Sequence, residues 1–265
     1  MSSLLDRFAS LHPSLGEDGI LELVFDGPNL NAVGEEVHSD LAVVWHAIDT
    51  DPDVRTVLVR GANGAFSAGG RFDMIEKCMQ DYAYRTRMFK ETRGIVHGML
   101  ECSKPIVSAV QGVAVGAGLV VAILSDVSIV ARDTRLLDGH TRLGLAAGDV
   151  AVISWPLLCG MAKAKYHLLT CEPLTGERAA DIGLMTEAVD AADVDERARG
   201  IARQLNAGAQ DAIRFTKMAL NHWYRVMAPA FDFSVAAEMY GLGGPDVAEG
   251  KAAVKEKREP KFSGR

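Results

Sequence analysis

The chain has 265 residues, which is enough for one large domain or for one domain with a smaller appendage. Hydrophobic residues make up 48% of it and charged residues 24%, a globular composition that excludes a disordered chain. The 28 basic and 35 acidic residues leave a net charge of −7, which argues against general binding to nucleic acid or to an anionic membrane.

The pattern of apolar residues predicts strands that alternate with helices, followed by a helical C-terminal third. In chain order, we expect a strand over Gly19–Phe25, a helix over Val37–Ile48, a strand over Val54–Arg60, a helical region broken once over Phe72–Cys102, and strands over Pro105–Gln111, Val127–Ala131 and Thr186–Asp190. The central strand is apolar on both faces, as in a buried parallel sheet. The sequence therefore predicts an α/β fold with mostly parallel pairing.

One uncharged run, Pro105–Ser125, is long enough to span a bilayer as a helix. Its internal order argues otherwise, because a β-branched run comes first, three glycines interrupt it, and a second apolar run ends at Asp126. We therefore expect a buried strand, a glycine turn and a buried helix, and no membrane span.

The four cysteines are spread along the chain without the spacing of a zinc site or a disulfide framework. They are Cys78, Cys102, Cys159 and Cys171. We expect free thiols in a reducing compartment. The N-terminal segment has no long apolar stretch, so we expect no secretion signal and a cytoplasmic location. The seven histidines do not fall at metal-ligand spacings, and we expect no metal.

Two glycine motifs come close to known signatures but fail in context. The segment Gly112–Gly118 fits part of a dinucleotide fingerprint, but it lies too far into the chain to open a cofactor-binding unit. The segment Ala65–Gly69 is close to a nucleophile elbow, but a turn at residues 61–64 already ends the strand before Ser67. Neither a P-loop nor a zincin motif occurs.

Two glycine-rich turns are more informative, because each precedes a predicted helix. Residues 67–70 precede the helical region that begins near Phe72, and residues 116–118 precede the apolar run 119–125. Backbone N–H groups at a helix N-terminus favour negative charge. If the two turns converge, they form an oxyanion hole for a carbonyl oxygen that develops enolate character.

His140 lies in a loop-like segment between Asp138 and Asp149. A carboxylate beside a histidine fixes its tautomer and stabilises its charged form, which suits an acid/base role. The spacing alone leaves a solvated or structural loop histidine as the alternative.

Several segments together resemble the crotonase, or enoyl-CoA hydratase/isomerase, superfamily. They are PNLNAV (28–33), FSAGG (66–70), KPIVSAVQGVAVGAGLVVAILSD (104–126), GERAADIGLMTEAV (176–189) and EGKAAVKEKREPKFSGR (249–265). The resemblance implies a spiral of ββα units in residues 1–200, a helical trimerisation region in residues 201–265, and homotrimers or dimers of trimers. It also implies acyl-CoA substrates, with no cofactor beyond the coenzyme A of the substrate, and an oxyanion hole made by the amides of Gly70 and Ala117.

The sequence departs from this superfamily at the two glutamates with which its hydratases add water, where it has Val120 and His140. The loop from His140 to Asp149 is similar to that of carbon–carbon hydrolases of the 6-oxocamphor hydrolase type, in which an aspartate orients a histidine that activates water. The resemblance implies His140 as general base, Asp149 as its orienting partner and Asp138 as a weaker substitute. We expect substrate contacts from Ala68, Phe72, Asp138 and Val120.

Three functions remain open at this point. The first is enolate chemistry on an acyl-CoA thioester, favoured by Ala117 because the hydrolase has a histidine there. The second is retro-Claisen hydrolysis of a β-diketone by the same histidine and aspartate. The third is a non-catalytic acyl-CoA-binding protein. None of them calls for nucleic acid or a membrane as a partner.

Overall fold

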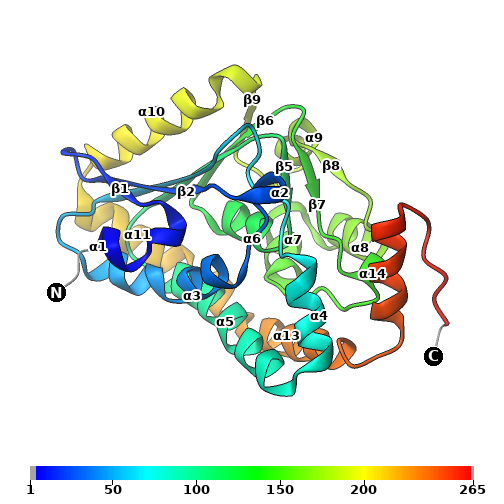
Figure 1. The fold of residues 1–265 in the computed structure, drawn as a ribbon. Coiled ribbons are helices and arrows are strands. Elements are labelled where there is room, and N and C mark those ends of the chain that lie inside the picture. The colour runs from blue at the N-terminus through cyan, green and yellow to red at the C-terminus, as the bar shows by residue number, and fades with distance from the viewer. Residues whose placement is uncertain (1–3, 264–265) are drawn as a thin grey trace.

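The computed structural model describes residues 4–263. Residues 1–3, at the start of the predicted core unit 1–200, and residues 264–265, at the end of the predicted C-terminal region 201–265, lie outside the described residues. The strands are β1 (Ser14–Leu15), β2 (Ile20–Phe25), β3 (Thr56–Gly61), β4 (Ile106–Val110), β5 (Val113–Val115), β6 (Val127–Ala131), β7 (Arg135–Leu137), β8 (Leu174–Thr175) and β9 (Glu187–Val189). Within residues 4–263 they form a six-stranded sheet in the order β1-β2-β3-β4-β6-β9 and a three-stranded sheet in the order β5-β7-β8 (Figure 1).

Helices surround both sheets. They are α1 (Leu4–Arg7), α2 (Pro28–Asn31), α3 (Glu35–Thr50), α4 (Phe72–Gln80), α5 (Tyr82–Glu101), α6 (Gly116–Leu124), α7 (Ala151–Cys159), α8 (Met161–Thr170), α9 (Gly176–Asp181), α10 (Val194–Asn206), α11 (Gln210–Leu220), α12 (His222–Val226), α13 (Ala228–Gly241) and α14 (Asp246–Glu256). The short 3₁₀ turns in the described chain are η1 (Ala9–Leu11), η2 (Thr141–Leu143) and η3 (Ala191–Asp193).

The strands predicted from sequence are β2, β3, β4, β6 and β9, and all of them belong to the larger sheet. Within the larger sheet the described strands from β2 to β9 pair in parallel, and β1 runs antiparallel to β2. The helical region from Phe72 is broken once, as predicted. The break is at Asp81, whose side chain accepts hydrogen bonds from the N–H groups of Ala83 and Tyr84 at 2.8 and 3.1 Å and so caps α5.

The central strands β3, β4 and β6 are buried on both faces over most of their length, which explains why they are mainly apolar. Val57 and Val59 of β3 belong to the main core with α3 and α5, whereas Leu58 points to the opposite core with Ala198 and other residues of α10. In Figure 1, α10 lies on one side of the sheet and α3 and α5 lie on the other. Successive side chains of a strand point to opposite faces, so both faces must be apolar.

The uncharged run Pro105–Ser125 forms β4, β5 and the nine-residue helix α6, as the glycine pattern predicted. No helix in residues 4–263 has the length and apolar character needed to cross a membrane. The smaller sheet was not predicted, because each of its three strands spans only two or three residues.

The C-terminal helices pack partly against the rest of the same chain. Helix α13 contacts α5 and α7, and α14 contacts the turn η2 that follows His140. The residues after 200 therefore help to enclose the loop in which the candidate acid/base residue lies.

Candidate active site

The two glycine turns predicted from sequence lie side by side. The Ser67 N–H donates to the carbonyl oxygen of Val113, and the Val115 N–H donates to that of Ser67, both at 3.0 Å. A Cβ atom placed on Gly116 would be 3.9 Å from the amide nitrogen of Gly70. The first turn is thus held against β5 by backbone hydrogen bonds, and the two turns converge.

Glycine is required at three positions of this junction. Gly69 and Gly116 have φ angles of +85° and +48°, in the left-handed region that side chains disfavour. Gly118 lies in the first turn of α6, and a Cβ atom there would be 2.4 Å from the Cβ atom of Ser67. The close approach of the two turns therefore depends on the absence of a side chain at residue 118.

The amides of Gly70 and Ala117 remain available to a ligand. The bridge between Val33 and Gly70 uses the carbonyl of Gly69 and the N–H of Arg71, so it does not engage the N–H of Gly70. Ala117 is in the first turn of α6, where an N–H has no intrahelical acceptor, and no described side chain caps this helix. Both residues line one cavity of about 420 Å³.

The cavity is mainly apolar, with a few polar groups on its wall. Ala68, Phe72 and Val120 line it, as expected of substrate contacts. Asp138 was expected there too, but it lies behind His140 with 2% of its side chain exposed and is not part of the lining. An apolar cavity with a small number of convergent polar groups is typical of a small-molecule site.

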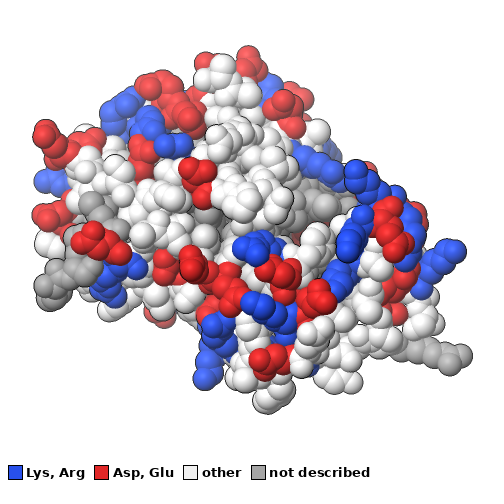
Figure 2. Space-filling model, viewed as in Figure 1, with Lys and Arg blue, Asp and Glu red and all other residues white. Residues whose placement is uncertain are grey.

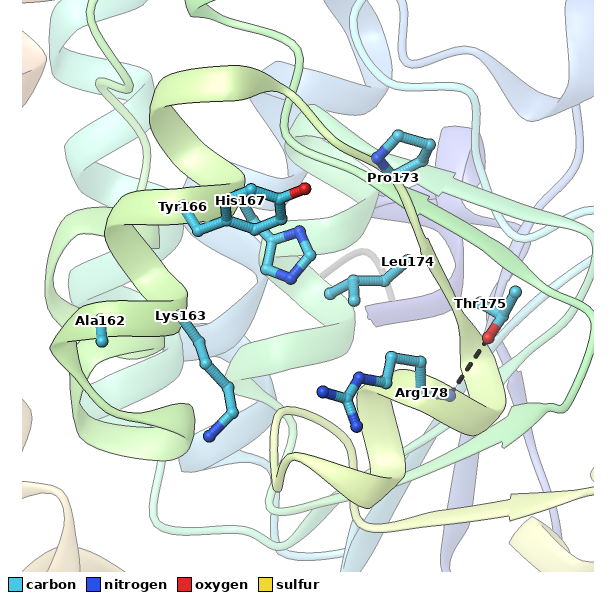
Figure 3. Close-up of a pocket in the computed structure, with 8 residues that line it drawn as sticks. All are labelled: Ala162, Lys163, Tyr166, His167, Pro173, Leu174, Thr175 and Arg178. Atoms are coloured by element: carbon cyan, nitrogen blue, oxygen red, sulfur yellow. Dashed lines mark hydrogen bonds between the residues drawn. The ribbon is translucent and has the colours of Figure 1, made fainter.

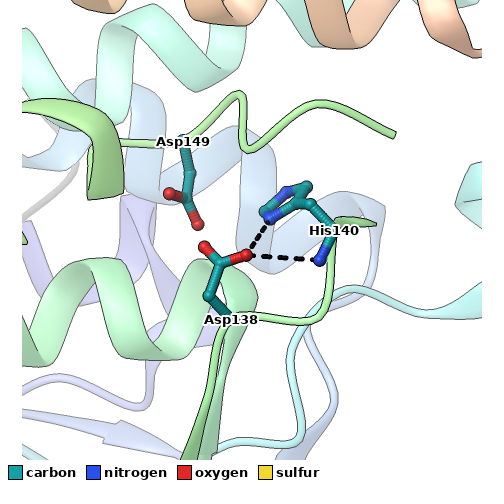
Figure 4. A group of neighbouring side chains, drawn as sticks. All are labelled: Asp138, His140 and Asp149. Carbon is teal, nitrogen blue, oxygen red and sulfur yellow. Dashed lines mark hydrogen bonds and ion pairs between the residues drawn. The ribbon is translucent and has the colours of Figure 1, made fainter. Parts of the chain in front are cut away.

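His140 lines the same cavity and is held by Asp138 (Figure 4). One oxygen of Asp138 accepts the backbone N–H of His140 at 3.2 Å and lies 2.9 Å from ring atom Nδ1. The resemblance implied Asp149 as the orienting partner of His140 and Asp138 only as a weaker substitute. The structure reverses this order, because β7 ends at Leu137 and places Asp138 two residues before the ring that it holds.

Asp149 makes its hydrogen bond with the backbone and not with the ring of His140. Its side chain accepts the N–H of Ala151 at 2.9 Å, at the start of α7, and it lines the cavity beside His140. Burial, together with the charge of Asp138, raises the pKa of Asp149 to about 7. Asp149 is therefore a buried carboxyl that gains or loses a proton near neutral pH.

The charge of His140 is stabilised by its surroundings. Burial by itself opposes the imidazolium, but the carboxylates of Asp138, Asp149 and Glu238 outweigh it and raise the pKa of His140 well above its usual range. For Asp138, burial is likewise outweighed by His140, so its pKa is lowered. Imidazolium and carboxylate are thus the forms of this pair at neutral pH.

Asp138, His140 and Asp149 offer ligand atoms within 4.8 Å of one another, a spacing that a cation could use. Ring atom Nδ1 is already in a hydrogen bond with Asp138, and the raised pKa of His140 favours a proton over a metal on the ring. The donor set therefore fits a proton-carrying cluster better than a metal site.

Glu238 is a further residue of the site that was not predicted from the sequence. It comes from α13, lines the cavity, and has one carboxylate oxygen 3.8 Å from Nε2 of His140. Burial raises the pKa of Glu238. No motif marks this residue, because it is brought to the site by the packing of a helix almost a hundred residues further along the chain.

A second pocket lies between α8, β8 and α9 (Figure 3). It is lined by Lys163, Tyr166, His167 and Arg178, among others, and contains none of the site residues predicted from sequence. Within it, the Thr175 hydroxyl accepts the N–H of Arg178 at 3.1 Å, which is an ordinary helix cap. We therefore place the candidate active site at the glycine turns.

Comparisons with known proteins identify the family of this chain. The sequence profile of the enoyl-CoA hydratase/isomerase family matches residues 16–265. A probable enoyl-CoA hydratase from Rhodobacter capsulatus is 29% identical over 252 residues, which cover 94% of this chain and 96% of the relative. An enoyl-CoA hydratase/isomerase from Mycobacterium paratuberculosis has a similar structure, with a TM-score of 0.86 and 31% identity over 93% of this chain and 98% of the other.

A β-diketone hydrolase from the cyanobacterium Anabaena has the same fold, with a TM-score of 0.83, 24% identity, and coverage of 92% of this chain and 98% of the other. The fold, the paired glycine turns and the cavity beside them define an enzyme of the crotonase type. The chain belongs to the enoyl-CoA hydratase/isomerase family. The crotonase-like α/β fold with a helical C-terminal region is thereby confirmed.

Proposed function

We propose that this protein binds an acyl-CoA thioester and stabilises its enolate, with the thioester oxygen accepted by the amides of Gly70 and Ala117. The observation that carries the proposal is that both amides and the ring of His140 line one apolar cavity. Preorganised N–H donors are worth most where charge develops in a water-poor site. The enolate oxygen carries a negative charge that develops during the reaction in such a site.

His140 supplies acid/base chemistry in this proposal. Val120, at the position of one family glutamate, is a buried hydrocarbon wall of the cavity and cannot transfer a proton. Because the pKa of His140 is raised, the ring holds a proton at neutral pH. It therefore acts first as a proton donor and becomes a base after it has given up that proton. This refines the role of general base that the resemblance implied.

The coenzyme A phosphates are proposed to meet Arg71 and Arg142, which line the cavity with nearly half of each side chain exposed. Each is paired with a surface carboxylate, Asp73 and Glu259 respectively, and such exposed pairs stabilise a protein by about 0–1 kcal/mol. A phosphate can therefore displace them. In Figure 2, basic and acidic side chains lie interspersed around α14, the helix that contacts the turn η2 in which Arg142 lies. The mechanism needs no cofactor beyond the coenzyme A of the substrate.

The proposal is tested by replacing His140 and assaying a panel of enoyl-CoA and acyl-CoA thioesters. His140→Ala is expected to lower turnover by about 10²-fold or more. The matched control is His46→Ala, which removes an exposed histidine of α3. Wild-type activity in His140→Ala would remove this residue from the mechanism, and failure of wild-type enzyme on every thioester would refute the proposal.

Hydrolysis of a cyclic β-diketone is the second candidate, supported by a buried carboxylate on the histidine ring. Water activation needs the neutral ring, so this activity would rise with pH as His140 loses its proton. A panel of cyclic β-diketones assayed beside the thioesters separates the two reactions. Stabilisation by coenzyme A without turnover of any compound would instead favour a binding protein.

We also propose self-association into trimers through the C-terminal helices. Large apolar side chains are exposed there, including Trp223 with 67%, Phe233 with 74% and Tyr240 with 88% of the residue accessible. Several large apolar side chains exposed on these helices of a single chain favour an interaction site there. A cytoplasmic location is also proposed, and the four free cysteines and the net charge of −7 support it.

A further inference from the structure

We propose that Glu238 of α13 is a second proton-transfer residue of this site and works opposite His140. The inference rests on the proposed function. It assigns to α13 the role that Val120 cannot fulfil at the family position in α6.

The geometry places the imidazole ring between two carboxylates. Asp138 is 2.9 Å from Nδ1, on the side of the ring away from the cavity lining, and Glu238 is 3.8 Å from Nε2. Glu238 itself lines the cavity and has 16% of its side chain exposed. Asp138 thus orients the ring, while Nε2 and Glu238 share the space in which a substrate would lie.

Helix α13 is fixed firmly enough to position this carboxylate. Phe231, Val235 and Glu238 lie four and three residues apart, so they share one helix face, and the first two are fully buried. On another face, Asp232 accepts two hydrogen bonds from Arg93 of α5, at 2.7 and 3.1 Å. The helix therefore cannot rotate without breaking both the core contacts and this pair.

The absence of a side chain at Gly148 leaves room for Glu238. A Cβ atom on Gly148 would be 2.1 Å from Oε2 of Glu238, so glycine is needed there for the carboxylate to enter. Asp149 follows directly and lines the same cavity. Burying a carboxyl group at this position costs more free energy than burying an apolar side chain. Packing alone therefore does not explain why the chain makes room for Glu238.

The charges around Glu238 suit proton transfer. It faces His140, Asp138 and His38, and His38 is in turn 2.7 Å from Glu91 of α5. Burial raises the pKa of Glu238, an effect that Asp138 reinforces and that His140 and His38 oppose. Glu238 has a raised pKa and lies beside His140, which binds a proton tightly. These two side chains can therefore pass one proton between them.

The reaction that follows is a 1,3-proton shift in an unsaturated thioester. The Glu238 carboxylate removes a proton from carbon, which breaks a C–H bond and forms an O–H bond. The oxyanion hole holds the resulting dienolate, and the His140 imidazolium gives its Nε2 proton to the other end of the allylic system. Transfer of the new proton from Glu238 to His140 restores both groups, so that atoms and charges balance without a further reactant.

The test compares Glu238→Gln with His140→Gln in the conversion of a 3-enoyl-CoA to its 2-enoyl isomer. Each variant is expected to lose about 10²-fold or more in turnover. Because Glu238 takes the carbon-bound proton, Glu238→Gln should also lose exchange of the α-protons of butyryl-CoA in heavy water, whereas His140→Gln should keep it. Partial recovery in Glu238→Asp would show that the carboxylate matters and not the shape of the side chain.

Two further measurements make the result decisive. Binding of a coenzyme A thioester to Glu238→Gln should stay within about threefold of wild type, and the control Glu101→Gln, at the exposed end of α5, should change nothing. NMR titration of the His140 ring should show its pKa lowered by about 1 unit in Glu238→Gln, because a nearby opposite charge has been removed.

An unchanged His140 pKa, or full turnover in Glu238→Gln while His140→Gln is inactive, would overturn this inference and leave the proposed function standing. If wild type converts no thioester and exchanges no α-proton, the proposed function fails and the inference fails with it.

Discussion

The contact between Gly118 and Ser67 gives the sharpest test of the oxyanion hole. An alanine at residue 118 would bring its Cβ atom to 2.4 Å from the Cβ atom of Ser67, whereas two carbon atoms need about 3.5 Å. Ser67 must therefore move by about 1 Å. Its hydroxyl donates to the carbonyl of Asn31 and accepts from the N–H of Gly69, so the turn that presents Gly70 must move with it.

We expect Gly118→Ala to lower kcat/KM by about 10²-fold, because a misplacement of about 1 Å has this effect on an aligned site. Overpacking should also lower the free energy of unfolding by about 1–3 kcal/mol. The assays are steady-state kinetics on the best thioester, thermal unfolding, and the affinity for a coenzyme A thioester.

The control is Gly200→Ala in α10, where a Cβ atom would meet nothing within 4 Å. It should keep full activity and gain about 0.5–1 kcal/mol, because alanine is the better helix former. If Gly118→Ala kept kcat/KM within threefold of wild type, the two turns would not act together as one oxyanion-binding unit.

Three further predictions concern the site, its charges and the assembly. Gly70→Ala should fold normally, because its Cβ atom meets nothing within 4 Å, yet it should weaken thioester binding at least tenfold by crowding the amide; wild-type affinity in a binding titration would contradict this. Asp149 has a raised pKa in the folded protein, so its contribution to stability is fully present below the ordinary aspartate pKa of 3.8 and is lost as pH rises from there to about 7. The thermal midpoint of Asp149→Asn, which keeps the acceptor for Ala151, should therefore rise relative to wild type between pH 5 and 8, and a constant difference would exclude such a titration. Phe233→Glu should dissociate the proposed trimer in light-scattering measurements at unchanged helicity, whereas a monomeric wild type would remove this surface as the interface.

The positions along the chain of five strands of the larger sheet and of the glycine turns follow from local sequence, whereas the order of the strands in the sheet does not. A strand buried on both faces has to be apolar throughout, and a turn that brings backbone within contact distance of backbone has to contain glycine. These are constraints on neighbouring residues, and they mark β4 and the turns at Gly69 and Gly116 without knowledge of the fold. The resemblance to the crotonase superfamily added the pairing of Gly70 with Ala117.

Local sequence patterns could not predict which side chains from distant segments of the chain come into contact. The sequence offers two aspartates near His140, and only the path of the chain after β7 selects Asp138 as the residue that holds the ring. Glu238 is 98 residues beyond His140, since 238 − 140 = 98, and it carries no motif. It enters the cavity because Phe231 and Val235 bury their helix face against the core. Local patterns fix which residues are apolar or flexible, whereas the meeting of charged groups depends on how separate helices pack.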